Sequence, residues 1–187
     1  AATATDISLA LVSQPGEPEA ISQISGLIVF PLDGNPITNA QEMRDILYMF
    51  KRSRTKAYSD NGGDPSSWTP IDIDDALGTS VHGISTVLDS GGINVDSMII
   101  ATYRGISQFN GRYPSSEQDL SWKIEDYWSN LDRTNFRLIQ IVNSPVKKKI
   151  YCILPSRNLL IGNYANGMNA KAIRWAPQSF FMGINTI

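Results

Sequence analysis

The hydrophobic residues of this 187-residue chain fall into short runs rather than long amphipathic stretches. Runs such as IIATY (99–103) and IYCIL (150–154) are rich in β-branched and aromatic residues and are bounded by Gly, Asn, Asp or Pro, as strands are. Helical periodicity is scarce. One candidate, NAQEMRDILYMF (39–50), becomes strand-like from Ile46, which leaves at most a turn near residues 41–44. The pattern predicts an all-β protein.

The runs recur with a period of about 53 residues. Trp68, Trp122 and Trp175 are 54 and 53 residues apart, and each follows a turn rich in Gly and Asn: SDNGGDPSS, FNGRYPSS and YANGMNAK. Arginines interrupt the apolar runs at positions spaced by 52 and 53 residues: Arg52, Arg104 and Arg157. Independent landmarks with one period predict a repeated structural unit.

Each unit is expected to hold four antiparallel strands, A to D. Strand A is predicted at 26–32, 83–88 and 136–142, and strand B at 46–50, 97–103 and 149–154. Strand C is predicted at 55–59, 105–109 and 158–164, and strand D carries the phased tryptophan. Four antiparallel strands repeated every 53 residues are typical of the blades of a β-propeller.

The prediction is therefore an all-β, partial β-propeller of about three four-stranded antiparallel blades with incomplete flanking blades. Residues 26–78, 79–132 and 133–179 are the three blades. Residues 1–25 are assigned to the outer strands of a preceding blade, and 180–187 to the first strand of a following one. Because a propeller has to close, we expect one sector of a longer chain or blades supplied by another copy.

Composition narrows the classes of partner. A formal net charge of −2 and a pI near 5.3 provide no cationic field for nucleic acid or an anionic membrane, so no specific nucleic-acid partner is expected. No apolar run reaches the roughly 18 residues of a membrane-spanning helix, and the first residues lack the order of a signal peptide, so we expect no membrane insertion. The single cysteine, Cys152, excludes an internal disulfide and is expected in the core.

With these units laid out, the sequence resembles the propeller domains of bacteriophage tail, nozzle and head-completion proteins. The resemblance lies in SQPGEPEA, DGNPITNAQEMRDILYMFKRSRTKAY, DPSSW, IDIDDALGTSVHGISTV and MIIATYRGISQFNG. It covers almost the full chain and rests on the order of strands and turns within a blade. It implies a structural protein located in the virion, a homo-oligomeric ring around the tail axis, and other virion structural proteins as partners.

Two turn motifs contain residues that could form a site. Ser59-Asp60-Asn61-Gly62 with Trp68 resembles the Asp-box of sialidase-type propellers, but the tryptophan follows the aspartate by 8 residues instead of five, so a structural turn is expected. Asp64 and the acidic run 72–75 offer oxygen ligands for calcium but lack the register of an EF-hand loop. Solvated turn charges explain them more simply, and no metal or other cofactor is expected.

The sequence offers little evidence for a catalytic site. Glu125 with Asp126 or Asp119 could be nominated for glycoside hydrolysis, which needs two facing carboxylates, but neighbours on a strand point to opposite faces. The single histidine, His82, lies in GTSVHGIST without a nucleophile elbow. The lysines at 147–149 indicate an exposed hairpin tip. No enzymatic activity is predicted.

The recurring arginines are the most informative hint of binding. Arg52, Arg54, Arg104 and Arg157 occupy one position of the repeat, so they are expected on one face, where they could bind a partner's carboxylates. The alternative, which is more common for arginines at turns, is a rim of solvated turns. The first hypothesis is a docking surface in the tail or head-to-tail region of a virion. An alternative is a glycan-binding or glycan-cleaving propeller for host recognition, favoured if a loop between blades gathers aromatics and carboxylates. A third hypothesis is a cellular scaffold propeller, but the sequence lacks the Trp-Asp and kelch signatures of such proteins.

Overall fold

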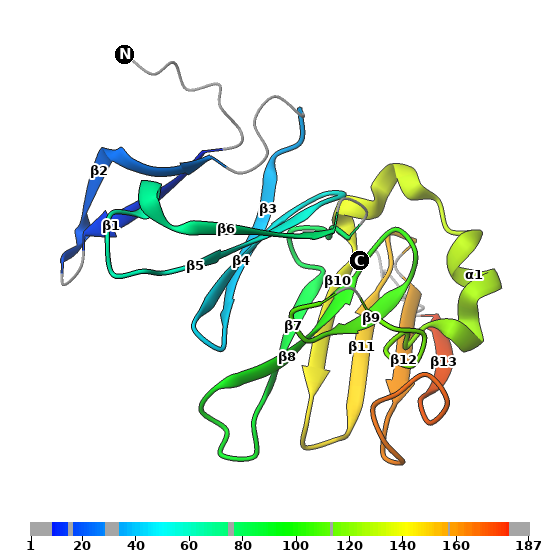
Figure 1. Ribbon diagram of the computed structural model, residues 1–187. Helices are drawn as coiled ribbons and strands as arrows, with labels where there is room; N and C mark the ends of the chain where they lie inside the picture. The colour runs from blue at the N-terminus through cyan, green and yellow to red at the C-terminus, as the bar shows by residue number, and fades with distance from the viewer. Residues whose placement is uncertain are drawn as a thin grey trace, which may run out of the picture.

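Strands dominate the part of the chain that the structure describes (Figure 1). The structure, a computed structural model, describes residues 9–14, 17–28, 34–74, 77–112, 114–156 and 158–179. The strands are β1 (Leu9–Gln14), β2 (Glu17–Ile28), β3 (Ile37–Met43), β4 (Ile46–Lys51), β5 (Thr55–Ser59), β6 (Thr69–Asp74), β7 (Ile84–Leu88), β8 (Val95–Ala101), β9 (Ile106–Phe109), β10 (Gln140–Ser144), β11 (Lys149–Ile153), β12 (Asn158–Asn163) and β13 (Arg174–Ser179). The predicted all-β class is confirmed.

Across the ranges that the structure describes, helical segments are short and lie outside the sheets. One α-helix, α1 (Glu125–Ser129), follows the 3₁₀ turn η2 (Trp122–Ile124). Two further 3₁₀ segments are η1 (Pro65–Ser67), just before β6, and η3 (Arg133–Leu138), just before β10. These segments connect or flank strands and do not form a layer of their own.

The strands pair with their neighbours in sequence to form antiparallel sheets. Two sheets have the strand orders β3-β4-β5-β6 and β10-β11-β12-β13, and a third has the order β7-β8-β9. In this middle sheet a single bridge between Ser107 and Asp119 stands in the place of a fourth strand. A two-stranded sheet, β1-β2, precedes them. The three larger sheets lie within the predicted units 26–78, 79–132 and 133–179, so the predicted repeat of consecutive antiparallel strands is present.

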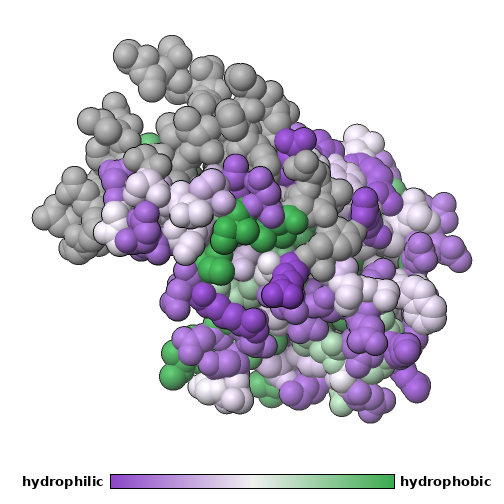
Figure 2. Space-filling view, viewed as in Figure 1, coloured by the Kyte–Doolittle hydropathy of each residue, from purple (hydrophilic) through white to green (hydrophobic). Residues whose placement is uncertain are grey.

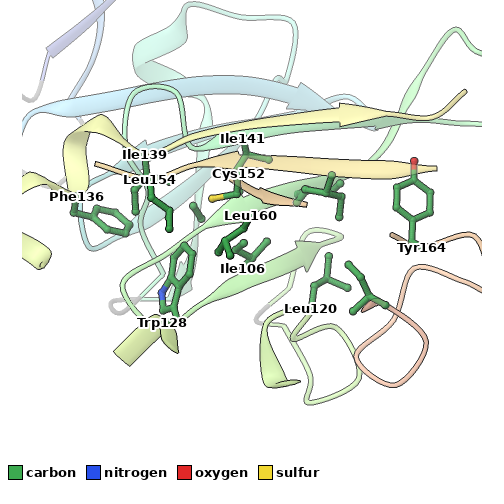
Figure 3. Packing of buried hydrophobic residues seen from close by; sticks show 14 residues of the cluster. Ile106, Leu120, Trp128, Phe136, Ile139, Ile141, Cys152, Leu154, Leu160 and Tyr164 are labelled. Atoms are coloured by element: carbon green, nitrogen blue, oxygen red, sulfur yellow. The ribbon is translucent and has the colours of Figure 1, made fainter. Parts of the chain in front are cut away.

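The three larger sheets stack face to face through β8, whose side chains alternate between two cores. Ile99 and Ala101 belong to the larger core, shared with β10, β11 and β12 (Figure 3). Met98 and Ile100 belong to a second core, shared with β3, β4 and β5. Alternation of this kind follows from the two-residue period of a strand. The middle sheet is therefore covered by a sheet on each side.

The first strands of the sheets are joined to one another at their starts. The Asn39 side chain of β3 donates to the carbonyl of Val81 (2.9 Å), two residues before Gly83 and β7. The backbone N–H of Ile141 in β10 donates to the carbonyl of His82 (2.9 Å). The Ser80 hydroxyl donates to the carbonyl of Ile139 at the start of β10 (2.8 Å). Hydrogen bonds thus bring β3, β7 and β10 together.

The predicted strand A of the first unit was placed wrongly. Residues 26–28 end β2, residues 29–33 lie outside the described residues, and the strand beside β4 is β3 (Ile37–Met43). β3 is polar, with Met43 its one buried residue, so it lacks the alternation expected of a strand. Its turn to β4 consists of Arg44 and Asp45, both with positive φ (54° and 61°), instead of the usual Asn-Gly.

In the described part of the second unit, the predicted strand D is not formed, because Trp122 lies in η2. The Asp119 carboxylate accepts from the N–H and the hydroxyl of Ser121 (3.0 and 2.8 Å), and after this Asx turn the chain enters η2 at Trp122. The fourth tryptophan, Trp128, is fully buried and donates from its indole to the carbonyl of Thr102 (3.2 Å). The tryptophan outside the 53-residue phase therefore fills the core.

In the third unit the strand predicted at 136–142 starts later, at Gln140. The Asp132 carboxylate accepts from the N–H of Thr134 (2.9 Å) and caps η3, which therefore occupies residues 133–138. The predicted B and C strands match β4, β8 and β11, and β5, β9 and β12, within one or two residues. These strands carry the continuous apolar runs.

Two of the polar segments singled out in the sequence form turns. The motif at 59–68 is a hydrogen-bonded turn: the Asp60 carboxylate accepts from Gly62 N–H (2.7 Å), and the Trp68 indole donates to the Gly63 carbonyl (3.2 Å). Lys147 and Lys148 lie in the exposed β10–β11 turn. The predicted strand at 180–187 lies outside the described residues, as do the first eight residues of the unit predicted at 1–25.

Candidate functional site

The predicted arginine cluster lies at the turns between the second and third strands of each unit. Arg52 and Arg54 lie between β4 and β5, and Arg104 lies between β8 and β9. Arg157 lies outside the described residues. Both Arg52 and Arg104 are exposed.

The turns of the first and second units meet at Tyr103, which sequence reasoning missed. The Arg52 guanidinium donates from Nε to the Tyr103 hydroxyl and lies 5.4 Å from the centre of its ring. The Arg133 guanidinium donates to the Tyr103 carbonyl and lies 5.9 Å from the same ring. Phe136 stacks on the ring at 4.2 Å with an interplanar angle of 18°. Arg52 therefore links two adjacent sheets, in addition to any contact with a partner.

A small polar pocket of about 230 Å³ opens beside Arg104. Its wall includes Thr102, Ser107 and Asp119, together with the loop residues Pro114 to Ser116. Asp119 is partly engaged by Ser121, as described above. The pocket joins one arginine and one carboxylate, so it can take a small polar group but offers no nucleophile with an adjacent base.

A larger pocket of about 500 Å³ lies between the loops of the second and third sheets. One wall is formed by Ser116, Glu117 and Trp122, and the other by the loop segment Asn169–Lys171 between β12 and β13. Trp122 is 57% exposed although it is the largest side chain type. An exposed indole with a carboxylate, an amide and an ammonium group beside it provides both apolar and polar contacts for a ligand.

The thiol and the imidazole do not form a catalytic pair. Cys152 is fully buried in the larger core, and burial raises the pKa of its thiol to about 12 (Figure 3). A thiol that stays protonated at neutral pH is a poor nucleophile. His82 is exposed and takes part in the structure through its backbone, which bridges to Gln140. The expectation that Cys152 is a core residue is confirmed.

The nominated carboxylates are placed differently from the prediction. Glu125 and Asp126 lie on α1, not on a strand, and both are exposed. Asp119 lines the smaller pocket, whereas Glu117 lines the larger one. Asp72 forms an ion pair with Lys56 (3.6 Å), and Asp75 lies outside the described residues. Within the described ranges, no group of three or more His, Cys, Asp or Glu side chains could hold a metal ion.

Comparison with other proteins adds no assignment. The chain matches no family model, and no curated protein matches it. Across the described residues, no helix has the length and apolar character needed to cross a membrane. Functional inference therefore depends on the surfaces and pockets themselves.

Proposed function

We propose that the chain is a structural component of a bacteriophage virion, in which its stacked sheets form a sector of a β-propeller and dock other subunits in the tail or head-to-tail region. The phage assignment rests on the resemblance of the repeated strand-and-turn pattern. The propeller geometry is supported by consecutive antiparallel sheets that stack face to face with their first strands joined (Figure 1). The docking role is carried by one observation, the outer face of the last sheet.

This outer face has an apolar row that runs across the whole sheet. Val142, Tyr151, Ile161 and Ala176 are cross-strand neighbours on β10, β11, β12 and β13, on the face opposite Cys152. Val142 is 53% exposed, and Ile153 beside the row is 40% exposed. In the view of Figure 2, another hydrophobic area surrounded by hydrophilic residues lies near the middle of the molecule, in the region where β4, β5 and β6 run in Figure 1. Scattered apolar side chains are ordinary on surfaces, whereas a row across a sheet indicates an interface.

We assign a second copy of the chain to this face. Inside the chain, the corresponding faces of the first and second sheets are covered by the next sheet, through Tyr48 and Phe50 and through Ile99 and Ala101. Among the described residues, no sheet covers the row on β10–β13. A second copy, placed against this face as each sheet of the chain is placed against the next, would contact it head to tail. Such heterologous contacts close into rings when the rotation between copies permits.

The arginine positions fit a rim contact in such a ring. Arg54 and Arg104, with Arg52 bound to Tyr103, lie at corresponding turns of the repeat, where carboxylates of a neighbouring subunit can be reached. Rim charges of this kind set orientation and association rate more than affinity. We therefore assign the binding energy to the apolar row and the orientation of the two subunits to the arginines.

The test is the oligomeric state of the purified chain, measured by light scattering coupled to size exclusion across a concentration series. We expect self-association in the wild type and a monomer in the double variant Val142→Lys with Ile153→Lys, because two buried charges would face the partner. The matched control is Val146→Lys, in the same hairpin but at its 94% exposed tip. A wild type that stays monomeric at all concentrations would refute the assembly proposal.

The virion assignment has its own test. Particles purified from the phage that encodes the chain should contain it in a fixed copy number, measured by quantitative mass spectrometry. Its absence from the particles would refute the virion placement while leaving the self-association result intact.

A further inference from the structure

The pocket beside Trp122, defined by Ser116, Glu117, Trp122, Asn169, Ala170 and Lys171, has features that an assembly surface does not require. Its volume of about 500 Å³ lies within the range of roughly 300–1,000 Å³ typical of small-molecule sites. Its aromatic side chain remains 57% exposed at the pocket wall. A large exposed indole beside a hollow of this size is suited to stacking on a ligand.

The two walls are fixed to each other by hydrogen bonds, so the pocket is preformed. The N–H of Ala170 donates to the carbonyl of Glu117 (2.9 Å). The Lys123 ammonium donates to the carbonyls of Lys171 and of Ile173, the latter at 3.2 Å. The Trp175 indole donates to the carbonyl of Leu120 (2.6 Å), which joins the same two parts of the chain. A preformed site loses little conformational entropy when a ligand binds.

The polar groups at the pocket are mixed and balanced in charge. Asn169 accepts from the N–H groups of Lys171 and Ala172 (3.1 and 2.9 Å) through Oδ1, which leaves its amide nitrogen to donate. The Glu117 carboxylate accepts only, and the Lys171 ammonium donates only. One negative and one positive group favour neither an anion nor a cation. They suit a neutral ligand that carries many hydroxyl groups.

From this geometry we propose that the pocket binds a neutral hexopyranose unit of a glycan. The C–H face of the sugar ring stacks on Trp122, because the face of an indole is electron-rich and attracts polarised C–H groups. The hydroxyl groups donate to Glu117 and accept from Asn169 and Lys171. One carboxylate lines this pocket, whereas glycoside hydrolysis uses a facing pair, so the site binds a sugar without cleaving it.

The experiment screens the full chain on an array of neutral and sialylated glycans and then titrates the best free trisaccharide by calorimetry. We expect binding to neutral glycans, and at least a tenfold loss of affinity in Trp122→Ala. Trp122→Phe should restore part of the affinity, because a smaller aromatic face remains. Glu117→Gln should weaken binding as well, because the amide accepts hydroxyl donors less strongly than the carboxylate.

The matched control is Tyr127→Ala, which removes an aromatic side chain that is 37% exposed on α1 and does not line the pocket. It should bind like the wild type. Circular dichroism and the oligomeric state should be unchanged in every pocket variant, so a failure here is distinct from a failure of assembly. No binding to neutral glycans at millimolar concentration would overturn the proposal. So would unchanged affinity in Trp122→Ala, or binding to sialylated glycans alone.

Discussion

Cys152 shows how one buried side chain sets a pH limit on stability. Burial raises the pKa of its thiol from an ordinary value of 9.0 to about 12. The folded chain therefore keeps the proton at a pH where the unfolded chain has lost it, so stability is full below about pH 9 and falls as pH rises toward 12. We expect the urea midpoint of the wild type to fall between pH 8.5 and about 10, and the fall to be shallower in Cys152→Ala.

The comparison has to be made between slopes, because Cys152→Ala also leaves a small cavity that lowers stability at every pH. Tyr58 contributes at higher pH, since burial and the nearby Asp72 raise its pKa to about 12 from an ordinary 10.0. The interval just above pH 9 therefore isolates the thiol. Equal slopes for the wild type and Cys152→Ala in that interval would contradict the assignment.

At the scale of elements, the β3–β4 hairpin carries a turn whose sequence does not suit its backbone. Arg44 and Asp45 both have positive φ, which costs an L-residue roughly 1–2 kcal/mol, whereas glycine adopts it freely. We expect Asp45→Gly to raise the free energy of unfolding by about 0.5–1 kcal/mol, measured by urea denaturation. The gain is smaller than the strain because glycine also gains entropy in the unfolded chain.

A second hairpin supplies the controls. Lys148, in the β10–β11 turn, has a φ of 51°, so Lys148→Gly should stabilise as well. Its neighbour Lys147 is not among the residues with positive φ, so Lys147→Gly should be neutral or destabilising. If all three glycine variants shift stability in the same direction, strain in these turns is not the cause.

The β3–β4 hairpin shows where prediction of the strands from the sequence fails. β8 and β11 carry continuous apolar runs between turn residues, and both were predictable from composition and length. β3 was not, because it buries one residue and turns without glycine. Trp122 fitted the repeat but follows an Asx turn at Asp119, and side-chain hydrogen bonds of that kind override a weak periodicity.

The candidate site depends on contacts that are distant in sequence. The arginine positions followed from the repeat and are found at corresponding turns where the structure describes them. The pocket beside Trp122 joins residues near 117 with residues near 170, and nothing local to either loop indicates that they meet. Trp122 could be found from the sequence because it fits the 53-residue repeat. Its exposure could not, because it follows from the loss of the expected strand.

For the whole molecule, the sheets share cores in a way that predicts a single unfolding transition. Ile99 and Ile100 are neighbours on β8, are both fully buried, and belong to different cores. Loss of either core would leave one face of the middle sheet exposed to water. The three larger sheets should therefore unfold together, without a stable state in which one core persists.

We expect Ile99→Ala and Ile100→Ala each to lower the free energy of unfolding by about 2–5 kcal/mol, because each leaves a cavity in a tightly packed core. Both should move the same transition, seen equally by far-UV circular dichroism and by tryptophan fluorescence. None of the four tryptophans belongs to the second core, and Trp128 is buried in the larger one, so a shift of the fluorescence transition by Ile100→Ala would be transmitted between the sheets. Val146→Ala, at a 94% exposed position, should leave the transition in place. Two separate transitions, one sensitive to each isoleucine, would show instead that the sheets unfold independently.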